Sequence, residues 1–162
     1  MRRRTATILG AALLLAQGCP SAYQRTYERE TLRLESQQRA ADAQAAAEHA
    51  QASRFAAVAY FAVGSAVVGE DGQRELRWFI DKMQPYPQAV ILVQGFADST
   101  GAEAKNRTLS GDRARAVASY LSAQGVAPAR IVTQGYGTDS PAASNATGKG
   151  RRNNRRVEVT VR

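Results

Sequence analysis

Residues 89–93 form an uninterrupted apolar run, Ala-Val-Ile-Leu-Val. A strand without polar alternation is typical of the middle of a sheet whose two faces are both covered. Such a strand needs neighbouring strands beside it and helices above and below it. The run therefore predicts a domain in which helices pack on a sheet.

Strand and helix patterns alternate from Phe55 onward, which predicts an α+β domain with helices packed on a mixed sheet. The helix after the first strand has a buried face of Leu76, Phe79, Ile80 and Met83. The expected elements are a strand at 55–63, a helix at 69–84, a strand at 89–93, a helix from about Ser110 that ends before Gly125, a strand at 130–134 and a last strand at 157–162.

Residues 23–54 are rich in Ala, Gln, Glu and Arg and contain neither Gly nor Pro. This composition has high helix propensity. Large apolar residues are sparse, so the stretch cannot bury much surface on its own. A solvated helix, a loose coiled coil and a disordered tether all remain open for it.

The first eighteen residues have the layout of a secretory signal peptide. Three arginines, residues 2–4, precede an apolar segment at 8–16. That segment is too short for a membrane-spanning helix, which needs about 20 residues, but it suits an export signal. Export predicts a domain that works outside the cytoplasm.

The chain contains one cysteine, Cys19, and one histidine, His49. A disulfide within the chain and a Cys/His zinc site are therefore excluded. A Ser-His-Asp triad would have to use His49, which lies in a polar, alanine-rich stretch. We expect no enzyme activity, no cofactor and no metal.

Basic residues concentrate near the C-terminus. From Phe55 onward there are 14 basic and nine acidic residues, and five of the basic ones fall between Lys149 and Arg156. Such a cluster suits nucleic acid, anionic lipid or a polymer that carries carboxylates. The export signal and the lack of interleaved aromatic residues argue against nucleic acid.

A polar loop, Gly95–Gly101, leaves the apolar strand, and Arg113 follows Asp98 by fifteen residues. We expect Arg113 in the first turn of the next helix. Since strand ends and helix starts often meet at one edge of an α/β layer, Asp98 and Arg113 either flank a common site or form a plain salt bridge. Arginines from the basic cluster could add carboxylate-binding groups to the same site.

These segments carry a family resemblance. The chain is similar to the OmpA-like C-terminal domains over about residues 58–161, and the matching motifs occur in the right order. The resemblance implies a βαβαββ sandwich. The motifs are Tyr60–Ala66, Gly95–Gly101, Asn106, Leu109–Ala114, Gly135–Gly137, Pro141, Asn145, Gly150–Arg151 and Asn154–Val157.

The same resemblance implies a ligand, the peptidoglycan stem peptide, held at its meso-diaminopimelate residue. Asp98 would pair with the diaminopimelate ammonium and Arg113 with its carboxylate, while Asn106 braces the loop and Arg155 lies at the rim. Many members carry His-Thr where this chain has Phe96-Ala97. The expected ligand-binding residues are Asp98, Thr100, Gly101, Asn106, Leu109, Arg113 and Arg155.

The residues before Cys19 resemble the lipobox of bacterial lipoproteins, in which the cysteine becomes the lipidated first residue. In lipoproteins that stay in the inner membrane, an aspartate commonly follows the cysteine, whereas this chain has Pro20 there. We therefore expect the protein to be anchored by its lipid at the periplasmic face of the outer membrane. The expected division is a signal peptide at 1–18, a lipidated tether at 19–54 and the peptidoglycan-binding domain at 55–162.

This division predicts a lipid-anchored protein that links the outer membrane to the cell wall. Its partners would be peptidoglycan, the membrane and possible further envelope proteins. The alternative is a scaffold subunit of a larger envelope complex, of a Tol-Pal, secretion or motility type.

Overall fold

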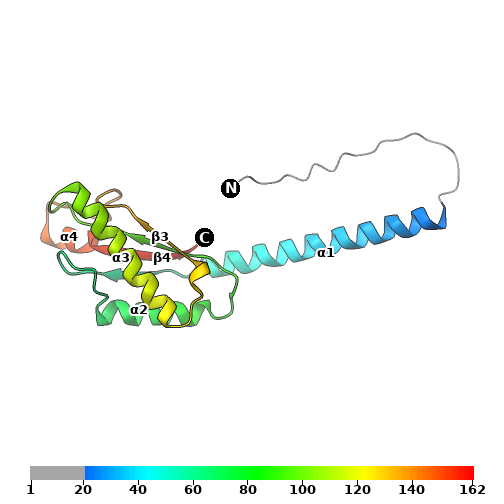
Figure 1. Cartoon of the computed structure of the whole chain (residues 1–162), viewed down its shortest axis with the longest axis horizontal. Helices are drawn as coiled ribbons and strands as arrows, with labels where there is room; N and C mark the ends of the chain where they lie inside the picture. Colours follow the sequence, from blue (N-terminus) through cyan, green and yellow to red (C-terminus); the bar gives the residue numbers. More distant parts are fainter. Residues whose placement is uncertain (1–20) are drawn as a thin grey trace. The chain divides into compact units, whose positions relative to one another are not determined.

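The computed structural model describes residues 21–162 (Figure 1). The predicted signal peptide and lipidated Cys19 lie outside this range. Contacts divide the chain into two compact units with a boundary between Ala41 and Asp42.

The N-terminal stretch is helical as far as Ala52, which agrees with the solvated-helix and coiled-coil alternatives for residues 23–54 and not with a disordered tether. Helix α1 covers Ala22–Ala52. At its start the Ser21 hydroxyl accepts a hydrogen bond from the Gln24 backbone N–H at 3.2 Å, and the Gln24 side chain accepts one from the Ser21 N–H at 2.9 Å. This reciprocal cap satisfies two donors that the helix itself leaves free.

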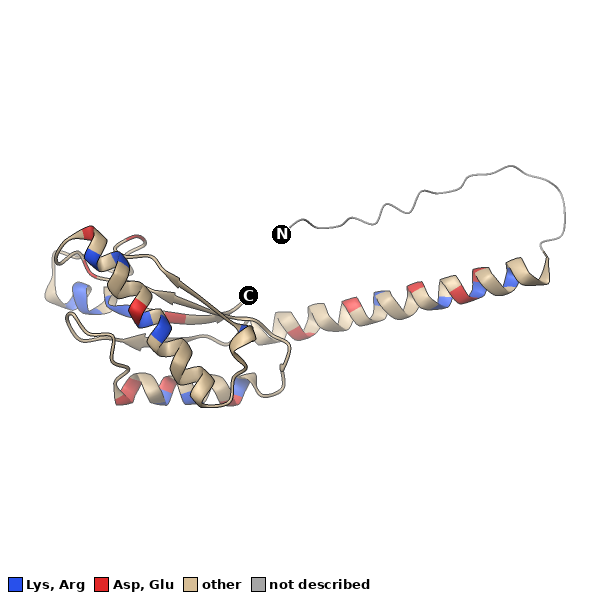
Figure 2. Ribbon diagram, in the orientation of Figure 1, with Lys and Arg blue, Asp and Glu red and all other residues tan. Residues whose placement is uncertain are grey.

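Basic and acidic residues alternate along the first two thirds of α1 (Figure 2), and Arg39 pairs with Glu35 one turn away at 3.2 Å. The large apolar side chains of its first half are all exposed. Local capping and helix propensity therefore support this part of α1, with little contribution from burial. These exposed apolar residues are Tyr23, Tyr27, Leu32 and Leu34. Within residues 21–162, no helix has the length and apolarity needed to cross a membrane.

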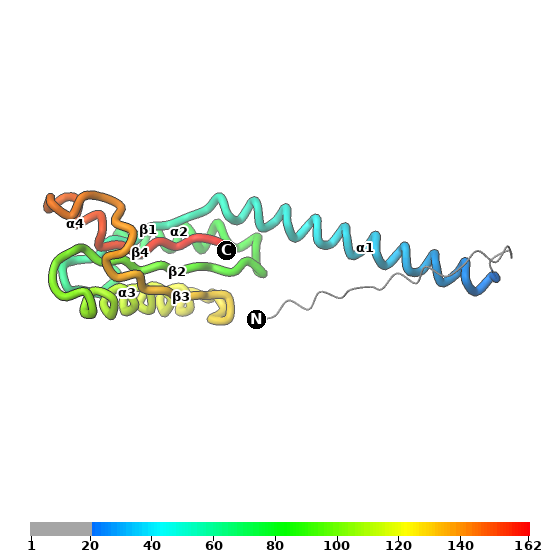
Figure 3. Tube along the Cα trace, turned by 90° about the horizontal axis from the view of Figure 1, so that it is seen from above, coloured from blue at the N-terminus to red at the C-terminus, as the bar shows by residue number. Residues whose placement is uncertain are grey.

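The second unit is built on a four-stranded mixed sheet. Its strands are β1 (Ala57–Tyr60), β2 (Ile91–Gly95), β3 (Ile131–Gly135) and β4 (Arg156–Val161). Their order in the sheet is β1-β4-β2-β3, with β2 and β3 parallel and β4 antiparallel to both of its neighbours (Figure 3). This topology confirms the predicted mixed sheet.

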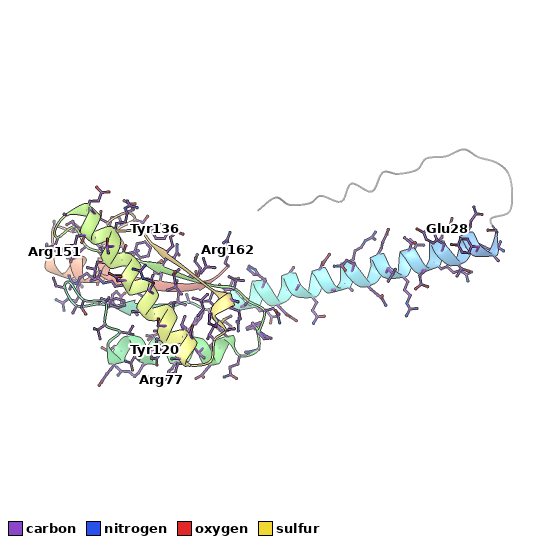
Figure 4. The ribbon with its side chains drawn as sticks, viewed as in Figure 1. Glu28, Arg77, Tyr120, Tyr136, Arg151 and Arg162 are labelled. Atoms are coloured by element: carbon purple, nitrogen blue, oxygen red, sulfur yellow. The ribbon has the colours of Figure 1, made fainter. Side chains whose placement is uncertain are left out.

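Helices α2 (Glu70–Met83) and α3 (Glu103–Ala123) pack on the same face of this sheet. Ala59 of β1 faces Gly72 of α2, and Gly95 of β2 faces Ser110 of α3. Ala59 and Gly95 both pair with Val157 of β4, so the two helices cover one face side by side. A hydrogen bond of 3.0 Å from Arg77 to the Tyr120 hydroxyl joins α2 to α3 (Figure 4).

The expectation that the apolar run has both faces covered is wrong. Strand β2 begins at Ile91, two residues later than predicted, and only Ile91, Val93 and Gly95 on its helix-facing side are buried. Leu92 on the opposite side is half-buried. The run is continuous because its first two residues lead into the strand, and the strand itself alternates between a covered and a partly open face.

The prediction that a helix begins near Ser110 is also wrong, because α3 begins at Glu103. Ser110 lies inside the helix and is buried; its hydroxyl donates to the Arg107 carbonyl and accepts from the Gly137 N–H, both at 2.8 Å. Residues 103–109 are mostly polar because this part of the helix faces solvent and the loop before it.

The other elements lie close to their predicted ranges, with two differences. Strand β1 is shorter than expected, because the chain leaves the sheet after Tyr60. The predicted basic turn contains a short helix, α4 (Gly148–Asn154), which begins at a Thr147 cap that accepts the Gly150 N–H at 3.0 Å. A single turn of 3-10 helix, Pro128–Arg130, precedes β3.

Strands β2 and β3 approach α3 so closely that only glycine fits. A Cβ atom on Gly95 would overlap the Ser110 carbonyl, and one on Gly135 would overlap the Gly111 backbone. We expect Gly95→Ala to lower the free energy of unfolding by about 3 kcal/mol, the upper end for overpacking. Denaturant unfolding followed by circular dichroism measures this.

Gly148→Ala is the matched control, since a Cβ atom there meets nothing within 4 Å. Its effect should stay within about 0.5 kcal/mol. Equal stability of the two variants would contradict the close approach of β2 and α3.

Candidate functional site

Three loop segments meet at one end of the sheet. The register pairs Tyr60 with Arg156 and Gly95 with Val157, so the ends of β1 and β2 and the start of β4 coincide. The segments after β1 and β2 and the helix α4 before β4 gather there (Figure 3). This arrangement brings together residues far apart in the sequence.

A pocket of about 190 Å³ lies between these segments. All seven residues predicted to bind ligand line it. Four further lining residues are not among those predicted. Of these, Val63 and Gly64 belong to the motif Tyr60–Ala66, Ala97 belongs to the loop Gly95–Gly101, and Lys105 directly precedes Asn106. The lining residues are Val63, Gly64, Ala97, Asp98, Thr100, Gly101, Lys105, Asn106, Leu109, Arg113 and Arg155.

Asp98 supplies the negative charge of the pocket. Its side chain is only 7% exposed, and its carboxylate accepts hydrogen bonds from Arg155 Nη1 at 2.8 Å and from the Thr100 N–H at 2.9 Å. Burial by itself raises the pKa of Asp98, but the hydrogen bonds from Arg155 and Thr100 and the charge of Arg155 outweigh it. The pKa therefore lies below its ordinary value, and the group is ionised at neutral pH.

The ion pair of Asp98 is with Arg155, so the alternative of a plain Asp98–Arg113 salt bridge is wrong. Arg155 also donates from Nε to the Phe61 carbonyl at 3.0 Å, which fixes its side chain between β1 and the β2–α3 loop. It was expected at the rim, but only 12% of its side chain is exposed and it forms part of the pocket wall.

Arg113 lies in the middle of α3 and is completely buried, which corrects its predicted place in a first helical turn. Its guanidinium donates to the carbonyls of Ser65 at 2.8 Å, Phe96 at 2.9 Å and Ala62 at 3.1 Å. These bonds use three of its five N–H groups, and the group also lines the pocket. Its central carbon lies 5.3 Å from the centre of the Phe61 ring.

Burial lowers the pKa of Arg113 to about 10, with a further lowering from the charge of Arg155 and an opposing effect from Asp98. A pKa near 10 leaves the guanidinium charged at neutral pH. The pocket thus holds a fixed cation that is not paired directly with the pocket's anion.

Asn106 holds the β2–α3 loop in its shape. Its side-chain amide donates to the carbonyls of Asp98 and Thr100, both at 3.1 Å. Gly101 has a φ of 92°, a backbone conformation that favours glycine. The Asn145 side chain accepts the Ser99 N–H at 3.2 Å and ties this loop to the segment before α4.

The arginines of the basic cluster have separate roles, and only Arg155 lines the pocket. Arg151, which is labelled in Figure 4, donates to the Asn145 carbonyl at 2.8 Å. Arg156 lies over the Phe96 ring at 3.9 Å, and Phe96 stacks on Tyr136 with ring centres 5.3 Å apart. Phe96 therefore packs in this stack and does not line the pocket, whereas Ala97 does.

The site offers opposite charges in a small enclosed volume, with backbone groups around them. It can hold a ligand that has an ammonium and a carboxylate close together. Within residues 21–162, no cluster of three or more His, Cys, Asp or Glu side chains could hold a metal ion. His49 lines another hollow of the second unit, beside Tyr86 and Arg162.

A comparison with protein families matches residues 60–155, more than half of the chain, to the OmpA family. The chain belongs to the OmpA family. This confirms the family resemblance of the sequence motifs.

Individual proteins are also similar to this chain. The chain is 49% identical over 81 residues to the peptidoglycan-binding protein ArfA of Mycobacterium tuberculosis, and 43% identical over 101 residues to the probable lipoprotein YiaD of Escherichia coli. These matches cover 50% and 62% of this chain, but only 25% and 46% of the relatives' own lengths. The matches to these relatives are therefore domain-sized.

Among solved structures, the peptidoglycan-associated lipoprotein of Burkholderia pseudomallei superposes with a TM-score of 0.62 at 29% identity. The match covers 65% of this chain and 90% of that one. It confirms the predicted α+β sandwich with helices on a mixed sheet.

The lowered pKa of Asp98 gives a stability prediction. A carboxyl group whose pKa is lower in the folded than in the unfolded state stabilises the fold above its unfolded pKa, about 3.9, and loses that effect as the pH falls through its folded value. We expect Asp98→Asn to be less stable than the wild type at pH 7, with the difference shrinking as the pH falls below about 4. Urea unfolding at a series of pH values measures it, and a constant difference would contradict the assignment.

Proposed function

We propose that this domain binds peptidoglycan non-covalently and holds the diaminopimelate end of a stem peptide in the pocket. The observation that carries the proposal is the enclosed pair of opposite charges, Asp98 and Arg113, that have no direct ion pair with each other. Diaminopimelate ends in an ammonium and a carboxylate on one carbon, so a site with both charges matches it. Similarity to a peptidoglycan-binding protein and to a peptidoglycan-associated lipoprotein supports the same ligand.

Asp98 can accept the ligand ammonium without losing its own partners. A carboxylate has about four acceptor positions, and the bonds from Arg155 and Thr100 use two of them. The ammonium would fill the remaining positions. The Arg155 pair would therefore orient the Asp98 carboxylate before the ligand arrives.

Arg113 is suited to the ligand carboxylate. Three of its N–H groups are held by carbonyls, which fixes the plane of the guanidinium, and two remain. Charge-assisted hydrogen bonds from a fixed guanidinium fork are strong and geometrically selective. Backbone groups of Thr100 and Gly101 would add weaker contacts.

The size of the pocket supports binding of one end of a residue. Sites for drug-sized molecules usually have about 300–1,000 Å³, whereas this pocket has about 190 Å³. A single charged end fits, and the rest of a stem peptide would lie outside. Such a site would bind the polymer at one residue of each stem peptide. Binding of this kind requires no catalytic step.

The proposal extends to the cell envelope. Lipidation at Cys19 would anchor the chain to the periplasmic face of the outer membrane, and residues 19–54 would act as a tether. As a continuous helix, the 31 residues of α1 extend roughly 46 Å at about 1.5 Å per residue. The chain would then link the membrane to the wall.

Binding to purified sacculi tests the ligand. We expect Asp98→Asn to lower the affinity by about 30-fold or more, because it leaves the ligand ammonium without its buried partner. Asp139→Asn is the control, since Asp139 is exposed, pairs with Arg107 and lies outside the pocket lining. Free diaminopimelate should displace the wild type from the sacculi. Equal retention of both variants and the wild type would refute the proposed site.

The lipid anchor is tested separately by mass spectrometry of the mature N-terminus. We expect the wild type to carry acyl chains on Cys19 and to sediment with membranes, because two or more acyl chains give stable anchoring. Cys19→Ser should be released into the soluble fraction. An unmodified cysteine in the mature protein would rule the anchor out and leave the binding pocket unaffected.

A further inference from the structure

Lys105 is a third cation beside the pocket. It lies in the first turn of α3, is exposed, and lines the pocket together with Asn106. Its nearest acidic neighbour along the helix, Glu103, lies 3.5 Å from Arg107, which also contacts Asp139 at 3.3 Å. Within the part of the chain that the structure describes, the Lys105 ammonium forms no ion pair or hydrogen bond.

The pocket lining carries more positive than negative charge, and binding the zwitterionic end of diaminopimelate leaves this excess unchanged. Asp98 contributes one negative charge, while Arg113, Arg155 and Lys105 contribute three positive charges. A bound ammonium and carboxylate add one charge of each sign. The ligand carboxylate faces Arg113 and Asp98 is shared with Arg155, so Lys105 is left without an anion.

The position of Lys105 indicates where that anion would come from. The pocket encloses about 190 Å³, so a stem peptide bound by one end must continue across its rim. Lys105 is exposed at this rim, whereas Arg113 is completely buried and Arg155 nearly so. It can therefore contact a part of the ligand that the buried arginines cannot reach.

We propose that Lys105 binds a second carboxylate of the stem peptide and makes the site select stems in which that carboxylate is free. The inference rests on the proposed function. Two groups supply this chemistry: the free carboxylate of the glutamate that precedes diaminopimelate, and the carboxylate at the other end of diaminopimelate when this residue terminates the stem. Amidation removes the negative charge from either.

The test uses three synthetic tripeptides, Ala-Glu-diaminopimelate with all carboxylates free, with the glutamate carboxylate amidated, and with the second diaminopimelate carboxylate amidated. Calorimetry gives their affinities for the full chain and for three variants. Lys105→Gln removes the charge and Lys105→Arg keeps it. Lys149→Gln removes an exposed charge from α4, outside the pocket lining.

We expect the wild type to bind one amidated peptide about two- to fivefold more weakly than the free acid, the range for an exposed charge pair. Lys105→Gln should lose this preference while binding the amidated peptide as well as the wild type does. Lys105→Arg and Lys149→Gln should keep it. Raising the salt concentration should reduce it, since the pair is exposed. The peptide that shows the effect identifies the carboxylate.

A preference that survives in Lys105→Gln, or a wild type without any preference, overturns the role of Lys105 and leaves the pocket assignment intact. Failure of the wild type to bind any of the three peptides overturns the proposed function itself. The two failures are therefore distinguishable.

Discussion

The buried guanidinium of Arg113 is the interaction on which the arrangement of the site depends. Removing a charge from water is expensive unless its hydrogen bonds are replaced. Here the replacements are three backbone carbonyls, from Ala62 and Ser65 after β1 and from Phe96 after β2. Because α3 supplies the cation and two other segments supply the acceptors, the charge can be satisfied only when all three are in place. The fold and the pocket are therefore formed together.

The Asp98–Arg155 ion pair adds a second set of links among the same segments. It joins the β2–α3 loop to the start of β4, and its Nε bond to Phe61 adds the end of β1. Asp98 and Arg113 each have their own partners. They therefore do not neutralise each other's charge. An ion pair between Asp98 and Arg113 would close the pocket, whereas the observed partners leave acceptor and donor positions free for a zwitterion.

Much of this architecture could be predicted from sequence, because periodicity records burial directly. Helix α2 and strand β4 lie within one residue of their predicted bounds, since Leu76, Phe79 and Val159 repeat at the helical and strand periods. The start of α3 could not be predicted in this way. Residues 103–109 are mostly exposed, so they show no apolar repeat that would indicate a helix. Ser110 resembled a helix cap, but its hydroxyl bonds Gly137, a contact between segments 27 residues apart that no local pattern reveals.

Motif matching predicts seven of the residues that line the pocket, but it does not predict the partners of their side chains. Asp98 and Arg155 are 57 residues apart, and their pairing follows from the antiparallel register of β1, β4 and β2. The sequence motifs indicate three of the four charged groups in the pocket, but the assignment of each charge to a partner is a property of the fold. Lys105 shows the same limit, because exposure on a polar helical turn does not by itself indicate a pocket.

The direction of β1 also has a mechanical consequence. The chain enters this strand at Ala57, at the end of the sheet opposite the pocket, and the proposed ligand would be held beyond Tyr60. A pull between tether and wall would therefore act along the strand. Ladder hydrogen bonds in an antiparallel pair run perpendicular to the strands, so such a load shears all of the bonds between β1 and β4 together instead of opening them one after another. The topology thus distributes tension over the whole strand pair.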